Sequence, residues 1–182
     1  KQGLQISCDL NFRKKLWTSE QANKTMSEII PYVDVCIANE EDAEKVFNIH
    51  ASKTNVLTGE LNREGYIEVA KEISERFHCH TVALRKSISA SDNKWSAMLY
   101  QGGQAHFSKE YAIHIVDRVG GGDSFGAGLI YGLRHFEKPQ EIIEFAVAAS
   151  CLKHSIEGDY NRVTVDEVLT LANGDGSGRV QR

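Results

Sequence analysis

From Asp117 to Gly128 the sequence reads D-R-V-G-G-G-D-S-F-G-A-G. This segment is the densest functional pattern in the chain. It follows the apolar run Ile113–Val116 and leads into a helical pattern from about Asp123 to His135. Three glycines let the backbone approach a ligand closely. The N–H groups of a helix N-terminus carry about half a positive charge, so the segment predicts an anion site. Asp123 would repel phosphate, but it suits a base that deprotonates a hydroxyl attacking a phosphoryl group.

A purely structural role for the same glycines stays open. The pattern G-x-x-x-x-G-K-[ST] is absent, and G-x-G-x-x-G fails because Phe125 occupies the position of its third glycine. The glycines could instead serve tight packing in a strand–turn–helix unit, with Asp123 placed favourably at the positive end of the helix dipole. Gly126, Gly128 and Gly132 are interpreted as packing glycines of that helix.

Strand-like and helix-like runs alternate outward from this segment. Apolar residues recur at helical spacing from about Arg63 to Phe77, Asn39 is placed as a helix N-cap, and Gly102-Gly103 suits a tight hairpin turn. The other expected elements are strands at Leu4–Cys8, Val33–Ile37, Thr81–Leu84, Trp95–Tyr100 and Ala105–Ser108, and helices at Ser19–Ile30 (ended by Pro31), at Glu40–Phe47, from Pro139 with one apolar face, and at Thr164–Ala172. This alternation predicts an α/β fold with a mostly parallel sheet layered by helices on both faces.

Composition excludes several classes of protein. The chain has 182 residues, 41% hydrophobic and 25% charged, with a formal net charge of −4, which predicts one soluble globular domain rather than disorder. No basic stretch suggests nucleic acid, and no apolar run approaches the roughly 20 residues that cross a bilayer. The cysteines Cys8, Cys36, Cys79 and Cys151 are far apart, which favours buried, reduced thiols and a cytoplasmic location.

Histidines show no metal-ligand spacing, and most are interpreted as surface or loop residues. These are His78, His80, His106, His114, His135 and His154.

The glycine segment resembles the second signature of the ribokinase-like sugar kinases, the PfkB family, whose usual form is D-T-x-G-A-G-D. Arg118 replaces the common Thr and Gly121 the common Ala. The resemblance implies that Asp123 is the catalytic base and that the amides from Gly120 to Asp123, including Gly121 and Gly122, form the anion hole. It also implies a ribokinase-like fold and the use of ATP and Mg²⁺.

Further segments are similar to the 2-keto-3-deoxygluconate kinase branch of that family. They are D-L-N-F-R from Asp9 to Arg13, N-E-E-D-A-E from Asn39 to Glu44, L-R-K-S from Leu84 to Ser87, L-K-H-S-I-E-G-D from Leu152 to Asp159, and G-D-G-S-G-R-V from Gly174 to Val180. The chain opens with Lys1, and the family's first signature is not among its residues. We therefore expect residues 1–182 to be a single α/β nucleotide-binding portion from the C-terminal part of a kinase, without the N-terminal sugar-binding half and lid.

Substrate residues are expected at the carboxyl end of the first strand and in a late loop. Asp9 and Asn11 suit either turn chemistry or ligand contact, whereas the guanidinium of Arg13 suits a carboxylate or phosphate unless it is only a solvated surface group. The resemblance places Asp159 near the sugar and Gly158 near the nucleotide. The predicted substrate-binding residues are therefore Asn11, Arg13, Gly120, Asp123 and Asp159.

The resemblance also suggests sites for nucleotide and metal. Nucleotide contacts are expected from Gly120, Gly122 and Gly158, and from a loop that holds Arg85, Lys86, Ser87 and Ser89. Asn39 and Asp42 match the family's N-x-x-E element, with Asp for Glu, so they could arrange Mg²⁺ through water as well as cap a helix.

The resulting hypothesis is an ATP- and Mg²⁺-dependent kinase that phosphorylates a sugar acid, with 2-keto-3-deoxygluconate as the expected substrate and its 6-phosphate as the product. A fructokinase or ribokinase type of sugar kinase is the first alternative. A non-catalytic module that binds a nucleotide or sugar phosphate is the second. The expected partners are the small sugar acid and ATP, with neither nucleic acid nor membrane. A homo-oligomer is compatible with the sequence.

Overall fold

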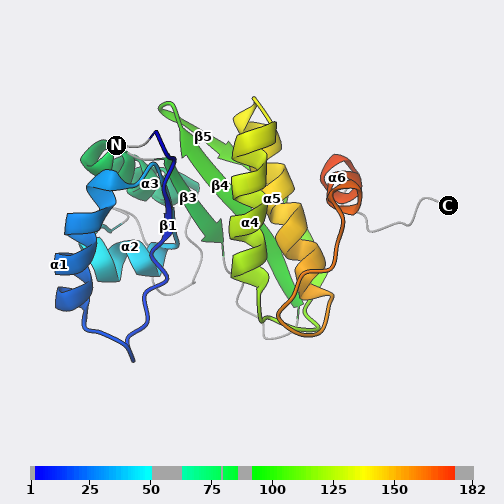
Figure 1. Ribbon diagram of the computed structural model, residues 1–182, viewed down its shortest axis with the longest axis horizontal. Coiled ribbons are helices and arrows are strands. Elements are labelled where there is room, and N and C mark those ends of the chain that lie inside the picture. Colours follow the sequence, from blue (N-terminus) through cyan, green and yellow to red (C-terminus); the bar gives the residue numbers. More distant parts are fainter. Residues whose placement is uncertain (1–2, 51–62, 79, 86–91, 175–182) are drawn as a thin grey trace. The chain divides into compact units, whose positions relative to one another are not determined.

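The computed structural model describes residues 3–50, 63–78, 80–85 and 92–174 (Figure 1). The chain forms two compact units. Unit 1 is Lys1–Leu84 with Met98–Ala105, and unit 2 is Arg85–Ala97 with His106–Arg182. The strands follow the order β1-β2-β3-β4-β5, and β6 pairs with β4.

Unit 1 is built on parallel strands. β1 (Ser7–Asp9) pairs in parallel with β2 (Val35–Ala38), and β2 pairs in parallel with β3 (His80–Arg85). All four residues of β2 are buried, as expected for an inner strand of a parallel sheet. The pairing between β4 and β6 is antiparallel, so the predicted mostly parallel sheet is confirmed in part.

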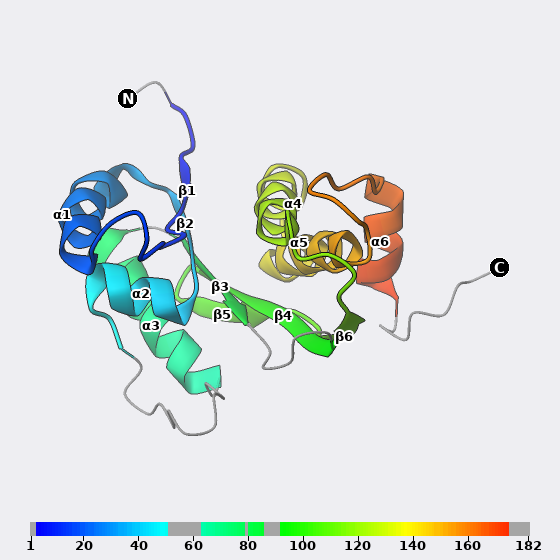
Figure 2. The same ribbon diagram turned by 90° about the horizontal axis from the view of Figure 1, so that it is seen from below.

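Three helices accompany these strands: α1 (Ser19–Ile29), α2 (Glu40–Phe47) and α3 (Arg63–Phe77), all visible in Figure 2. The bounds predicted for α2 and α3 are confirmed. α1 ends at Ile29, one residue before the predicted end. Pro31 does not end the helical region, because it lies inside a short 3₁₀ helix, Ile30–Tyr32, that follows α1 directly. Proline is tolerated there because the first turn of a helix needs no N–H from it.

The core of unit 1 lies between these helices and the strands. Ala22 and Met26 of α1, Val46 and Phe47 of α2, and Ile73 of α3 are all buried. The rings of Phe47 and Phe77 have centroids 4.6 Å apart. This packing holds α2 against α1 and α3, and the hydrogen bond from the N–H of Phe12 to Asp42 joins the start of α2 to the chain that follows β1.

The predicted hairpin is confirmed. β4 (Asp92–Gln101) and β5 (Gln104–Phe107) are joined by Gly102 and Gly103, whose φ angles of 60° and 79° suit a primed turn. The first part of β4 belongs to unit 2, where it pairs with β6 (Tyr111–His114).

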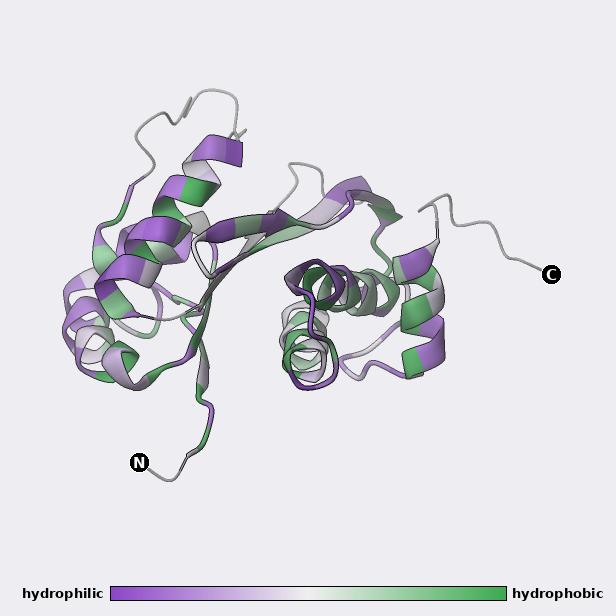
Figure 3. Cartoon of the chain, turned by 90° about the horizontal axis from the view of Figure 1, so that it is seen from above, coloured by the Kyte–Doolittle hydropathy of each residue, from purple (hydrophilic) through white to green (hydrophobic). Residues whose placement is uncertain are grey.

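Unit 2 also contains α4 (Gly121–His135), α5 (Pro139–His154) and α6 (Val165–Asn173), with α4 and α5 side by side in Figures 1 and 2. Hydrophobic colour covers much of both helices in Figure 3. A Cβ on Gly128 would meet Ala146 at 3.0 Å, and one on Gly132 would meet Ile142 at 3.1 Å. The interpretation of these two glycines as packing glycines is therefore confirmed.

Burial of α5 differs from the expectation of a single apolar face. Ile142, Ile143 and every residue from Phe145 to Cys151 are buried, so the helix is covered around its circumference. The cysteines also differ in part, since Cys36 and Cys151 are buried but Cys8 is partly exposed. Cys79 lies outside the described residues.

No helix in the described ranges has the length and apolar character to span a bilayer. The same ranges contain no group of three His, Cys, Asp or Glu residues placed to hold a metal ion.

Candidate active site

The glycine segment forms an open helix N-terminus. α4 begins at Gly121, two residues before the predicted start, and Gly120 is its N-cap with φ of 75° and no side chain to cap the helix. Gly121 donates its N–H to the carbonyl of Arg118 at 3.2 Å. The N–H groups of Gly122 and Asp123 belong to the first turn, where an α-helix offers no internal acceptor. The backbone alone can therefore bind an anion here.

Three other helices close their first turn with side chains, whereas α5 has no side-chain cap and starts with Pro139, which has no N–H to offer. α1, α2 and α6 each have a capping box, built on Thr18, Asn39 and Thr164 respectively. α4 lacks such a cap, and this difference leaves its N–H groups available.

Asp123 lies at the third position of α4 and is solvent-exposed. No other described residue forms a hydrogen bond or an ion pair with its carboxylate. A carboxylate that is exposed beside an anion site has the position that a base needs if it is to take a proton from a bound hydroxyl.

Asp159 lies directly against the glycine loop. A Cβ on Gly120 would collide with the main-chain oxygen of Asp159 and would lie 2.7 Å from its carboxylate Oδ1. The structure therefore brings together Gly120 and Asp159, two of the residues predicted from the sequence. It also explains why position 120 requires glycine.

Asp117 holds this arrangement together, which sequence reasoning missed. Its Oδ1 accepts the N–H of Val119 at 2.9 Å, and its Oδ2 accepts the N–H of Gly158 at 2.8 Å. These bonds lower the pKa of the Asp117 carboxyl, which keeps it ionised. The carboxylate thus fastens the loop that carries Asp159 to the start of the glycine segment.

Helix α5 supports the same loop from beneath. The hydroxyl of Ser150 donates to the carbonyl of Gly121 at 2.8 Å, and the hydroxyl of Ser124 donates to the carbonyl of Ala149 at 3.0 Å. His154 is buried at the end of α5, so it is an exception to the interpretation of most histidines as surface or loop residues. The signal that could have found it is its place in the sequence, at the end of an otherwise apolar helix.

The second group of predicted residues lies in unit 1. Asp9 accepts the N–H of Asn11 at 3.1 Å, and Asn11 has φ of 39°, so the expected turn chemistry is present. Phe12 donates its N–H to Oδ1 of Asp42 at 2.9 Å. Arg13 follows with an exposed side chain at the carboxyl end of β1.

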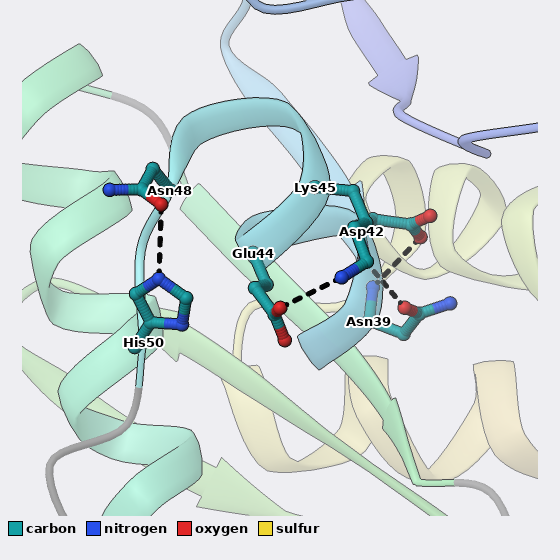
Figure 4. A network of polar contacts seen from close by, with 6 residues as sticks. All are labelled: Asn39, Asp42, Glu44, Lys45, Asn48 and His50. Atoms are coloured by element: carbon teal, nitrogen blue, oxygen red, sulfur yellow. Dashed lines mark hydrogen bonds and ion pairs between the residues drawn. The ribbon is translucent and has the colours of Figure 1, made fainter. Parts of the chain in front are cut away.

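Asn39 and Asp42 form the capping box of α2 (Figure 4). Oδ1 of Asn39 accepts the N–H of Asp42 at 2.8 Å, and Oδ2 of Asp42 accepts the N–H of Asn39 at 3.2 Å. Both carboxylate oxygens of Asp42 therefore accept a backbone N–H, and only 6% of the residue is exposed. The predicted N-cap is confirmed, whereas the metal role stays a prediction.

Farther along α2, the ion pair of Glu44 with Lys45 at 2.8 Å (Figure 4) lies at the surface, where such pairs contribute little to stability.

Part of the predicted nucleotide loop cannot be described. Arg85 is the last residue of β3, and Lys86, Ser87 and Ser89 lie outside the described residues. The described site residues thus form two groups. Unit 2 contains Gly120–Asp123, Gly158 and Asp159, and unit 1 contains Asn11, Arg13, Asn39 and Asp42.

Likeness to solved structures shows that the chain has a ribokinase-like α/β fold. Residues 1–164 match the model of the pfkB family carbohydrate kinases. The chain belongs to the pfkB family of carbohydrate kinases, as the glycine signature indicated.

Two solved structures show the likeness in detail. The crystal structure of 2-dehydro-3-deoxygluconokinase from Thermotoga maritima is 47% identical, with a TM-score of 0.88 over 94% of this chain and 51% of that one. A PfkB family carbohydrate kinase from Listeria grayi is 34% identical, with a TM-score of 0.81 over 94% of this chain and 51% of that one.

A curated relative adds a second named activity. 2-Dehydro-3-deoxygalactonokinase from Haloferax volcanii is 26% identical over 97% of this chain and 49% of its own length. The chain thus spans about half the length of the relatives it matches.

Proposed function

We propose that the protein is part of an ATP-dependent kinase that phosphorylates a hydroxyl of a sugar acid, with 2-keto-3-deoxygluconate as the substrate and its 6-phosphate as the product. The observation that carries the proposal is the open N-terminus of α4, where exposed Asp123 stands beside unpaired backbone N–H groups. A kinase needs both features at one place, because it must hold a phosphoryl group and deprotonate the attacking hydroxyl.

In the proposed reaction Asp123 takes the proton of the sugar hydroxyl. The hydroxyl oxygen then forms a bond to the γ-phosphorus of ATP, and the bond from that phosphorus to the β,γ-bridging oxygen breaks, so ADP leaves with the bridging oxygen. The N–H groups of the glycine loop that remain open, those of Gly122 and Asp123, stabilise the charge on the transferring phosphoryl oxygens. Asp159 contributes a second polar group on the substrate side of the loop.

Magnesium would neutralise charge on the phosphate oxygens of ATP when it is bound. Mg²⁺ usually keeps several waters and binds few protein carboxylates. Since each carboxylate oxygen of Asp42 already accepts a backbone N–H, contact of Asn39 and Asp42 with the ion would be made through water. No step of the proposed reaction depends on that contact.

The substrate class rests on Arg13 and on the relatives. A guanidinium can donate two parallel hydrogen bonds to a carboxylate, which distinguishes a sugar acid from a neutral sugar. Two of the relatives are named for 2-dehydro-3-deoxyglucono and 2-dehydro-3-deoxygalactono substrates, so the class is better supported than the stereoisomer. The supply of ATP and the free thiols are consistent with the cytoplasm as the place of action.

The test is Asp123→Asn in the full-length protein. Loss of the general base should lower kcat by about 10²–10⁴-fold, while ATP still binds within a few-fold of the wild-type affinity. A coupled ADP-release assay over sugar acids and neutral sugars gives kcat, and calorimetry gives the affinity for ATP.

Asp166→Asn is the matched control. Asp166 is also an exposed aspartate in the first turn of a helix, α6, but it is far along the chain from the glycine loop. Its replacement should leave kcat unchanged. Near-normal turnover of the Asp123 variant would remove Asp123 from the mechanism, and wild-type protein that binds ATP but phosphorylates no sugar would favour the non-catalytic module.

A further inference from the structure

His154 is held rigidly at the carboxyl end of α5. Only 3% of the residue is exposed, and its ring packs against Trp95 in a tilted arrangement, with centroids 4.5 Å apart and an interplanar angle of 58°. Nδ1 of His154 lies 2.6 Å from the carbonyl oxygen of Ser150. Because a carbonyl can only accept, Nδ1 carries the hydrogen, and the orientation of the ring is fixed by this bond and by the indole.

The edge of this ring faces Gly121, the first residue of α4. A Cβ on Gly121 would lie 2.6 Å from Cε1 and 2.7 Å from Nε2 of His154, much closer than non-bonded atoms approach. A Cβ on the next residue, Gly122, would meet nothing within 4 Å. The need for glycine at position 121 is therefore created by the imidazole and not by the turn itself.

The main chain of His154 holds the other end of the glycine segment. Its carbonyl oxygen accepts the N–H of Val116 at 2.8 Å and that of Asp117 at 3.3 Å. Ser150, one turn earlier in α5, donates its hydroxyl to the carbonyl of Gly121. The segment 116–121 is thus bound at both ends to the last turn of α5.

We infer that His154 is a positioning residue for the anion-binding loop, and that Gly121 is its sterically matched partner. The inference rests on the proposed function for its catalytic consequence. The ring limits how close the first turn of α4 can come to the end of α5, and so it helps to set the position of the Gly122 and Asp123 N–H groups. Displacement of a catalytic group by about 1 Å can cost on the order of a hundredfold in rate, so a contact of this kind can control turnover without touching the substrate.

The pairing also explains a departure in the signature. Gly121 occupies the position where the resembling signature has alanine, and the imidazole fills the volume that an alanine methyl group would take. A smaller residue at position 154 would make room for that methyl group.

The test is a double-mutant cycle in the full-length protein with Gly121→Ala, His154→Ala and both together. Each single change should lower kcat at least tenfold and change KM for ATP less than threefold, because it displaces the loop but leaves the N–H groups of the loop in place. If the two residues were independent, the loss in kcat of the double variant would be the product of the two single losses. We expect the kcat of the double variant to be at least tenfold higher than that product predicts, since residues in contact show coupling of this size. The unfolding midpoint of each protein is measured in parallel. Gly121→Ala should lower the midpoint by several degrees in wild type and not in the His154→Ala background.

Gly122→Ala is the control for stability, since its Cβ meets open space and its midpoint should stay near that of wild type. If His154→Ala fails to fold, His154→Ser takes its place, because a serine hydroxyl can bond the carbonyl four residues earlier. The pairing of Gly121 with His154 would be overturned if the two single losses in kcat simply multiplied in the double variant. It would also be overturned if the two shifts of the unfolding midpoint simply added. Wild-type protein that releases no ADP would refute the proposed function alone, and the midpoint cycle would still decide whether Gly121 and His154 are matched.

Discussion

Replacement of Asp42 by alanine should destabilise the protein and release the loop that carries Arg13. Asp42 is buried, and its two carboxylate oxygens accept the N–H of Phe12 at 2.9 Å and the N–H of Asn39 at 3.2 Å. The first bond joins residues 30 apart in the sequence, and Phe12 directly precedes Arg13. The carboxylate therefore connects the start of α2 to the loop after β1.

The magnitude follows from these two bonds. A hydrogen bond to a charged group contributes about 1.5–3 kcal/mol net, and a partly buried N–H left without an acceptor costs about 1–3 kcal/mol. Since the bond to Asn39 is long, the weaker end of the range applies to it. We expect Asp42→Ala to lower the free energy of unfolding by about 2–4 kcal/mol. Asp42→Asn should cost about 1.5–3 kcal/mol, because an amide offers one acceptor oxygen where the carboxylate offers two.

Chemical denaturation of the full-length protein measures the free energy of unfolding, and amide hydrogen exchange of Phe12 reports the connection directly. Asp34→Ala is a matched control, because Asp34 accepts the N–H of Ile6 at 2.8 Å but is exposed, so water can replace it. Exchange at Phe12 should accelerate in the Asp42 variants only, and KM for the sugar acid should rise. The reasoning is refuted if the free energy of unfolding of Asp42→Ala lies within roughly 0.5 kcal/mol of that of wild type, which is about the error of the method. It is also refuted if amide exchange at Phe12 is unchanged.

Two further predictions concern substrate choice and pH. Arg13→Met should raise KM for the sugar acid by about tenfold to a hundredfold and should change KM for neutral sugars much less. Arg13→Lys should restore KM for the acid only in part. An unchanged preference for acid over neutral sugars in steady-state assays would contradict the role of Arg13 in binding the carboxylate. Burial, with the positive charges of Lys153 and Arg118 nearby, holds the pKa of His154 below its ordinary value of 6.5. The unfolded chain therefore takes up the proton first, so this contribution to stability is complete above pH 6.5 and falls by up to about 1.4 kcal/mol per pH unit below it. Denaturation at several pH values should show a shallower fall in His154→Ser, and equal slopes would contradict it.

Features set by neighbours along the chain could be predicted from the sequence. The bounds of α3, Arg63–Phe77, follow from apolar residues at helical spacing, and the cap at Asn39 follows from its own side chain. The helix that starts within the glycine segment follows from the order of strand, glycines and helix, and the anion site there stays a prediction. In each case the physical cause lies within a few residues of the feature, so one sequence contains it.

Features set by contacts across the fold could not be predicted. Asp42 looks like a helix-cap residue in the sequence, and its bond to Phe12 depends on how α2 packs beside β1. α4 starts at Gly121 rather than at Asp123 although glycine itself disfavours a helix, and the contact of Ser150 in α5 with the carbonyl of Gly121 is not visible in the sequence. The burial of His154 likewise depends on the approach of α4 to α5.

A comparison of the first turns of the helices favours an anion site, rather than packing alone, as the reason for the glycines at the start of α4. A side-chain cap on α4 would add about 1 kcal/mol of stability, and three other helices have one. At Gly120 both the φ of 75° and the oxygen atoms of Asp159 exclude any Cβ, so no capping side chain can occur there. Packing alone does not require Asp159 to lie so close, because its loop is already fastened by Asp117 to Gly158. The close approach instead places the Asp159 carboxylate, which can accept a hydrogen bond from a hydroxyl, beside N–H groups that the helix leaves open, and this is the arrangement that the proposed kinase site would use.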